Sequence, residues 1–218
     1  MNATLPLVVQ LAAAGLAGWI LWRAAQALPW FKMRGDAEAQ RVLVGAALLI
    51  IGLRLFNTHG VAGVTVHFLG TSIAVLMFGA RFALWIAAAA SLATWLLGWA
   101  FQGWAVDFLL TGALPVAMTV LLGALVRLRL PAHIMVYVLG NAAAAGALAM
   151  AASVLGKAAL SWLVGAQHEA TLYLLATPPL MIGEAFFTGG VMVLVVVYRP
   201  HWCCSFDDGV YLRAGRDA

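Results

Sequence analysis

Long apolar stretches, joined by short connections, constrain this chain more than any other feature. Seven of them stand out in the sequence: Leu5–Trp22, Val42–Phe56, Val61–Ala80, Phe82–Gln102, Phe108–Val126, His133–Leu155 and Thr171–Tyr198. A helix needs about 20 apolar residues to cross the hydrocarbon core of a bilayer. Only 9% of the 218 residues are charged, whereas soluble domains carry about 25%. The sequence therefore predicts an all-α, polytopic integral membrane protein with about seven transmembrane helices.

Three of these stretches differ from a simple span. Val42–Phe56 has 15 residues, so we expect it to be tilted, interfacial or supported by its neighbours. Gly140 and Gly146 bracket an alanine run in the sixth stretch, and Pro178-Pro179 are predicted to break the seventh. Helix breaks at membrane depth are tolerated only where they are buried in protein or line a cavity.

The basic residues predict the orientation. Ten of the twelve Lys and Arg fall in alternate connections and the C-terminal segment: Arg23, Lys32, Arg34, Arg41, Arg81, Arg127, Arg129, Arg199, Arg213 and Arg216. Cytoplasmic loops carry such an excess of positive charge. We therefore expect an outward-facing N-terminus and a cytoplasmic C-terminus, with one transmembrane domain over residues 1–200 and a short cytoplasmic tail over residues 201–218. Arg54 and Lys157 are predicted at the opposite ends of their spans.

Two segments allow a second interpretation. Ala25-Gln26-Ala27 is similar to a signal-peptide cleavage site, but no basic residue precedes the first apolar stretch, so we expect that stretch to be retained. Cys203 and Cys204 are expected to be reduced thiols on the cytoplasmic side. Adjacent thiols lack the spacing of a zinc site, so a solvated tail is favoured over a site for metal hand-off.

Polar residues on the outward side are candidates for a metal site. His59, His168 and Glu169 fall in predicted outward connections, as does Asp107, and His67 lies seven residues into the third stretch. Imidazole is the commonest ligand for nickel, cobalt, copper and zinc, and a free α-amine can add a nitrogen. His67 is thus either part of an outward-facing, nitrogen-rich site or hydrogen-bonded to a neighbouring helix.

Glu184 is the carboxylate that the sequence places deep in a span. A buried carboxylate is costly unless it is paired, hydrogen-bonded or protonated. Glu184 could relay protons, ligate an ion, or pin two helices through a backbone group or Asn141, and Arg54 is a candidate partner. An intramembrane enzyme built on Glu184 and His67 is disfavoured, because no motif supplies a nucleophile. No stretch is long or polar enough for a nucleic-acid-binding module.

Two sequence segments resemble a known family. Leu55-Phe56-Asn57, followed by Gly63-Val64-Thr65-Val66-His67-Phe68-Leu69-Gly70, resembles the segment that leads into the third span of the CbiM/NikM family. Gly183-Glu184-Ala185-Phe186-Phe187-Thr188, with Arg199-Pro200, is similar to the end of that family's pattern. The resemblance extends over roughly residues 40–200. Members of this family are the substrate-binding membrane components of cobalt and nickel energy-coupling-factor transporters.

The resemblance implies a function and a set of partners. The chain would capture a nickel or cobalt ion on the outer face of the bacterial inner membrane, as substrate and not as a resident cofactor. A transmembrane coupling protein and cytoplasmic ATPases would drive its cycle within the lipid bilayer. The family's ligands correspond here to the amine of Met1 and to His67, and Asn57 joins Glu184 as a structural or ion-coupling candidate.

This chain departs from the family at its second residue. Asn2 stands where the family has a histidine, and an Asn side chain is a poor ligand for such metals. Either His59 or another loop histidine substitutes for it, or the fold serves another substrate. The alternative function is a non-transporting membrane protein of the same fold, with an assembly or regulatory role.

Overall fold

The computed structural model describes residues 5–29, 34–55 and 64–211, and all the regular secondary structure in these ranges is helical. Ten α-helices follow one another in these ranges: α1 (Leu7–Gln26), α2 (Ala37–Leu55), α3 (Thr71–Phe78), α4 (Ala80–Leu96), α5 (Trp104–Phe108), α6 (Leu114–Arg129), α7 (Ile134–Val136), α8 (Ala145–Leu163), α9 (Gln167–Tyr198) and α10 (Asp208–Tyr211). Two π-helical segments, η2 (Leu109–Ala113) and η3 (Tyr137–Ala144), join α5 to α6 and α7 to α8, and a 3-10 turn, η4 (Pro200–Trp202), follows α9. The all-α class is confirmed.

Four continuous helices in the described ranges are long and apolar enough to cross a membrane. They are Leu7–Gln26, Trp104–Arg129, Ile134–Leu163 and Gln167–Tyr198. The helix Ala80–Leu96 is equally apolar in character but shorter, at 17 residues. The π-helical segments lie inside the second and third of these spans, so each of those spans continues through a local change of winding.

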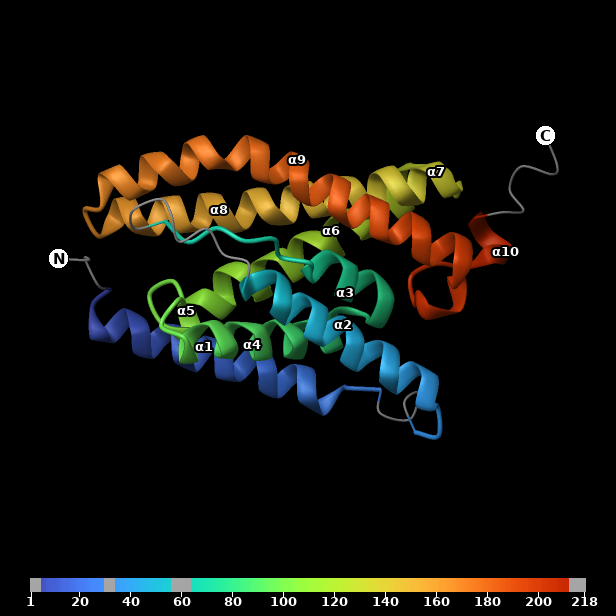
Figure 1. Ribbon diagram of the computed structural model, residues 1–218, viewed down its shortest axis with the longest axis horizontal. Coiled ribbons are helices and arrows are strands. Elements are labelled where there is room, and N and C mark those ends of the chain that lie inside the picture. Colours follow the sequence, from blue (N-terminus) through green and yellow to red (C-terminus); the bar gives the residue numbers. More distant parts are fainter. Residues whose placement is uncertain (1–4, 30–33, 56–63, 212–218) are drawn as a thin grey trace.

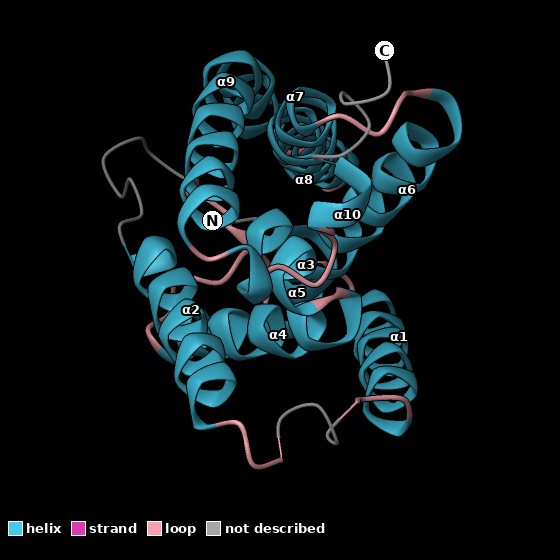
Figure 2. Cartoon of the chain, turned by 90° about the vertical axis from the view of Figure 1, so that its right-hand side faces the viewer, coloured by secondary structure: helices cyan, strands magenta, loops and turns pink. Residues whose placement is uncertain are grey.

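The long helices run roughly side by side, and α6, α8 and α9 alternate in direction (Figure 1). An end-on view places the short helix α3 in the middle, with α1, α2, α4, α6, α8 and α9 around it (Figure 2). Every residue of α3 from Thr71 to Met77 is buried. A helix that is buried on all sides has no polar face, and the sequence Ile73-Ala74-Val75-Leu76-Met77 fits that position.

The third apolar stretch is not the continuous helix that the sequence predicts. Residues 64–70 are non-helical, and only Thr71–Phe78 forms a helix. Gly70 adopts a left-handed backbone conformation, with φ of 63°, at the point where α3 begins. Apolar composition alone does not distinguish this segment from a helix, because the groups that satisfy its backbone come from distant helices.

The proline pair does not break the seventh stretch, contrary to the prediction. Pro178 and Pro179 lie inside α9, which is continuous over 32 residues. Figure 1 shows that α9 bends near its middle. A proline removes one backbone donor and crowds the preceding turn, so a long helix that is held by a neighbour accommodates it by bending.

The neighbour of α9 is α8, and small residues allow the two helices to approach closely. A Cβ atom on Gly146 of α8 would lie 2.7 Å from Thr188 Oγ1 and 3.0 Å from the Glu184 carbonyl oxygen of α9. A Cβ on Gly189 would lie 3.2 Å from that of Ala143. This small-residue contact is the packing mode expected where no hydrophobic force drives helices together.

The segment after α9 packs back on the end of α3 instead of being solvated. The amide groups of Cys204 and Ser205 donate to the carbonyl oxygens of Met77 and Leu76, at 3.0 and 3.2 Å. Cys203 is buried, and its Sγ lies 2.9 Å from Tyr137 Oη. Neither Cys203 nor Cys204 forms a disulfide, and Cys204 is exposed. These contacts satisfy the last carbonyls of α3, which a helix end otherwise leaves unpaired.

Candidate metal site

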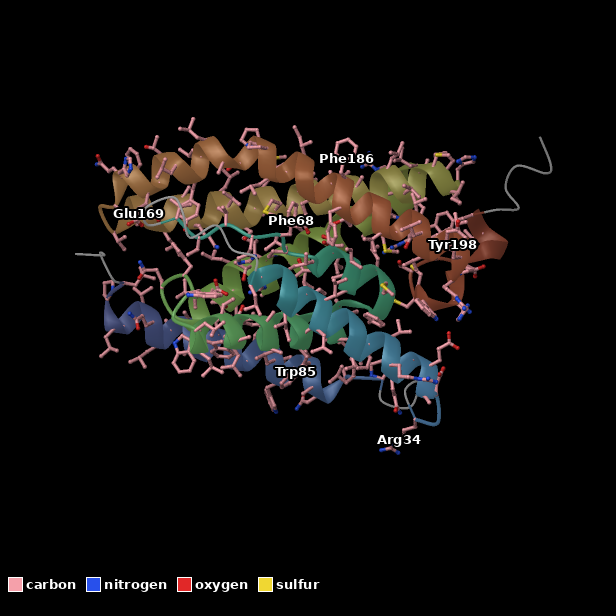
Figure 3. The ribbon with its side chains drawn as sticks, viewed as in Figure 1. Arg34, Phe68, Trp85, Glu169, Phe186 and Tyr198 are labelled. Carbon is pink, nitrogen blue, oxygen red and sulfur yellow. The ribbon has the colours of Figure 1, made fainter. Side chains whose placement is uncertain are left out.

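The extended segment 64–70 carries His67 into the interior of the helix bundle. The segment runs alongside α8 and α9 and leads into α3 (Figure 1), and the neighbouring Phe68 lies near the middle of the molecule (Figure 3). Val64, Leu69 and Gly70 are buried, and His67 is only 7% exposed. Non-helical backbone at this depth must find hydrogen-bond partners within the protein.

Side chains of α8 and α9 supply those partners. Lys157 Nζ donates to the Thr65 carbonyl oxygen at 3.0 Å, and the Thr65 amide donates to Tyr173 Oη at 3.1 Å. The amide groups of Leu69 and Gly70 donate to Glu184 Oε2 and Oε1 at 3.0 and 2.8 Å. The segment is thus fixed on both sides of His67, and the fixing residues belong to two helices that pack tightly on one another.

Glu184 acts as a pin, which is one of the roles left open by the sequence. Its carboxylate is fully buried and accepts from the two amide groups that immediately precede α3. A helix N-terminus presents unpaired N–H groups and a partial positive charge, so it is a suitable place for a buried carboxylate. The pin joins α9 to α3 through backbone groups and does not use Asn141.

Arg54 is not the hydrogen-bonding partner of Glu184 that the sequence suggested. Its Nη1 lies 3.1 Å from Asp107 Oδ2 and 2.7 Å from Ser91 Oγ, and its Nη2 donates to the Thr111 carbonyl oxygen at 2.9 Å. Asp107 is correspondingly buried within α5 and does not lie in an outward connection. This buried pair ties the end of α2 to α4 and to the π-helical segment η2.

The π-helical winding has a direct consequence for that pair. A π-helical turn shifts the ordinary pattern of backbone hydrogen bonds, and the Thr111 carbonyl oxygen within η2 accepts from Arg54. Thr111 Oγ1 also donates to the Asp107 carbonyl oxygen at 2.7 Å. Sequence reasoning missed this network, although the opposite charges of Arg54 and Asp107, both near span ends, were a signal that could have suggested it.

The His67 ring is oriented by its own backbone. Its Nδ1 lies 3.1 Å from the Phe68 carbonyl oxygen. When Nδ1 carries the proton and donates to this carbonyl, Nε2 is left with a lone pair that can bind a metal ion.

The N-terminal end of the chain approaches the same region. Leu5 is buried in a cluster that includes Val64 and Leu69, which flank His67, together with Phe101 and Tyr173. The Leu5 amide donates to Gln102 Oε1 at 3.0 Å, which fixes the chain just before α1. Met1, His59 and Asn57 lie outside the described residues. Within the described ranges, no group of three or more His, Cys, Asp or Glu side chains could hold a metal ion.

A comparison with models of protein families identifies the family to which this chain belongs. The family model of the cobalt uptake substrate-specific transmembrane region, CbiM, matches residues 1–202. The chain belongs to the CbiM family. It is therefore a membrane component of metal uptake and not an enzyme, and membership of the CbiM family implies partner subunits.

Solved structures share the fold of this CbiM family member. A crystal structure of a transition metal transporter aligns with a TM-score of 0.69 at 17% identity, covering 89% of this chain and 90% of that one. A truncated transition metal transporter aligns with a TM-score of 0.68 at 16% identity, covering 90% and 97% of the two chains. No curated protein sequence matches the chain.

Proposed function

We propose that this protein is the substrate-capturing membrane component of an energy-coupling-factor-type transporter, and that it takes up nickel or cobalt with His67 as a ligand. The observation that carries the proposal is the fixed extended segment, which holds a buried imidazole with one nitrogen engaged by the Phe68 carbonyl. A ligand that is held in advance loses little freedom when the metal binds. Family membership supports the same assignment.

The remaining ligands come, in this proposal, from the N-terminus and from His59. Leu5 packs in the same cluster as Val64 and Leu69. Four residues precede it, and an extended chain spans about 3.3–3.6 Å per residue, so the Met1 amine has a reach of about 14 Å. That reach supports a site in which the amine and the His67 imidazole meet. Asn2 removes the nitrogen donor of the family's second position, and His59 is proposed to replace it.

The proposed topology has seven spans, with the N-terminus outside and the C-terminus in the cytoplasm of a bacterial inner membrane. Two hydrogen bonds support a common basic end of the bundle. Arg81 at the start of α4 donates to the Ala27 carbonyl after α1, and Trp202 after α9 donates to Glu38 in the first turn of α2 at 2.8 Å. Arg34 and Tyr198 lie toward this end in Figure 3, and Glu169 lies at the opposite end. Excess positive charge marks the cytoplasmic side.

Metal-dependent stability of the purified, detergent-solubilised chain tests the proposal. A metal present at 100 times its dissociation constant is expected to stabilise the fold by about 2.7 kcal/mol. This shift should disappear in His67→Ala and persist in His201→Ala, where the exposed imidazole lies near Glu38 at the other end. An unchanged metal response in His67→Ala would refute the ligand assignment.

Because Asn2 stands where the family has a histidine, the alternative function can be tested separately. If the fold has lost its metal site, the folded wild-type chain shows no stabilisation by nickel, cobalt, copper, zinc or manganese. In that case Asn2→His is expected to create affinity where there was none. If the proposal holds, Asn2→His strengthens a response that already exists, and metal accumulation in cells requires both the chain and its coupling proteins.

A further inference from the structure

A groove lies between the last turns of α1 and the first turn of α4, at the basic end of the bundle. Its volume is about 500 Å³, and its wall includes Trp19, Ile20, Arg23, Gln26, Arg81 and Leu84. Arg23 belongs to the last turn of α1, and Arg81 is the second residue of α4. Two guanidinium groups from different helices therefore line one groove.

The charge in this groove has a single sign. Among the described residues, neither an Asp nor a Glu lines it. A second groove at the same end, of about 640 Å³, differs in this respect because Asp36 and Glu38 line it together with Arg81. The groove between α1 and α4 is thus the one whose charge suits an anion.

One of the two arginines is held in place without losing its charge. Arg81 Nη1 donates to the Ala27 carbonyl oxygen. A guanidinium has five N–H donors, so one bond to a neutral carbonyl leaves the others for a ligand. Arg23 is exposed at the same groove. Paired guanidinium groups are suited to phosphate, which they bind through two parallel hydrogen bonds.

Apart from Gln26, the rest of the wall is apolar, and it continues along the outer surface of α1. The Trp19 side chain is 57% exposed, and Trp22 and Leu16, on the exposed part of the same helix, are 58% and 49% exposed. In a membrane protein such a surface faces lipid, and tryptophan concentrates at the headgroup level. An anion that binds in this groove would therefore lie next to a surface that suits hydrocarbon chains.

We propose that this groove binds an anionic phospholipid, with the phosphate between Arg23 and Arg81 and an acyl chain along Trp19 and Leu84. Basic pockets between transmembrane helices on the cytoplasmic side recognise such headgroups. A soluble phosphate ion would use the two arginines but not the apolar wall. The lipid would bridge α1 and α4 at the end opposite to the N-terminus.

Native mass spectrometry of the purified full chain tests this site with phosphatidylglycerol and phosphatidylcholine that carry the same acyl chains. The wild-type protein is expected to prefer phosphatidylglycerol. One basic residue near a membrane surface is worth about a five-fold change in anionic-lipid binding. The preference should therefore fall about five-fold in Arg23→Gln and about 25-fold in the double variant Arg23→Gln/Arg81→Gln.

Arg129→Gln is the matched control, because Arg129 is an exposed arginine in the last turn of α6 that does not line the groove. It should keep the wild-type preference. Equal binding of the two lipids, or a preference that survives in the double variant, would overturn the proposal. A titration with inorganic phosphate separates the sources: if millimolar phosphate displaces the lipid, the occupant is a soluble anion and the lipid assignment is wrong.

Discussion

Replacement of Glu184 is the most direct test of how the extended segment is held. Its two carboxylate oxygens accept from the buried amide groups of Leu69 and Gly70, at 3.0 and 2.8 Å. A hydrogen bond to a charged group contributes about 1.5–3 kcal/mol, and its loss leaves a buried donor unpaired. Glu184→Ala is therefore expected to lower the free energy of unfolding by about 3–6 kcal/mol. Domain stabilities are about 5–15 kcal/mol, so this is a large fraction of the whole.

Glu184→Gln separates the hydrogen bonds from the shape of the side chain. The amide keeps one carbonyl oxygen but turns an NH₂ group toward the other donor, so about half of the loss, about 1.5–3 kcal/mol, is expected. Glu169→Gln, in the first turn of the same helix, is the control. It should cost less than about 1 kcal/mol, because a partly exposed acidic residue there contributes only through the helix dipole.

The assay combines unfolding in mixed detergent micelles with amide hydrogen exchange. If the carboxylate fixes the segment, exchange at Leu69 and Gly70 accelerates in Glu184→Ala well before the global transition. A loss of stability below about 1 kcal/mol, or unchanged exchange at these two amides, would contradict the assigned role. Under the proposed function, the same variant also weakens metal binding, because the segment that carries His67 is no longer held.

Three further predictions follow from single contacts. Arg54→Met leaves Asp107 charged, buried and unpaired, so it should cost about 3–5 kcal/mol, whereas replacing both residues by apolar ones should cost much less. Gly146→Ala should cost about 1–3 kcal/mol by overpacking, since the added Cβ would lie 2.7 Å from a hydroxyl of α9. The Trp202 indole lowers the pKa of Glu38 below 4.5, so the stabilising contribution of this contact is present at neutral pH and is lost as the pH falls through that lowered pKa.

The glycine and Glu38 predictions each have a matched comparison. Gly15 has open space where a Cβ would be, so Gly15→Ala should be neutral or slightly stabilising by helix propensity. Equal effects at the two glycines would contradict the close helix contact. For Glu38, thermal midpoints of wild type and Glu38→Gln should differ at pH 7 and converge in acid, and a constant difference would exclude the ion-dependent contact.

The class of fold could be predicted from the sequence because the length of apolar stretches and the placement of basic residues are local properties. Apolar stretches of span length and alternating basic connections are visible without any tertiary information. The prediction of a helix over residues 64–70 was wrong because tertiary contacts determine the conformation of this segment. Val64, Thr65 and Val66 are apolar or β-branched, and nothing in their order reveals that Lys157, Tyr173 and Glu184 will satisfy an extended backbone. A distant side chain decided the local conformation.

The sequence was sufficient to identify His67 as a candidate ligand, but not to identify the side chains that hold its segment in place. His67 was identifiable because histidine is rare inside a span and because the surrounding residues resemble a family motif. The charged residues were harder to interpret, since their depth in the sequence does not specify their partners. Lys157 and Arg54 appeared to flank the bundle, but they are buried within it and are bonded to Thr65 and Asp107. Pairing of this kind is a property of the assembled helices.

The buried charges also bear on which metals the proposed site can bind. Asp107 is engaged by Arg54, and Glu184 is engaged by two backbone donors. Lys157 donates to Thr65 and lies 5.6 Å from the centre of the Phe101 ring. Magnesium and calcium require oxygen ligands, and carboxylates above all, but the two buried carboxylates among the described residues already have structural roles. A site that is left with imidazole and amine nitrogens instead favours nickel, cobalt and copper. The bonds that hold the segment in place thus also engage Glu184, a carboxylate that a harder cation could otherwise use.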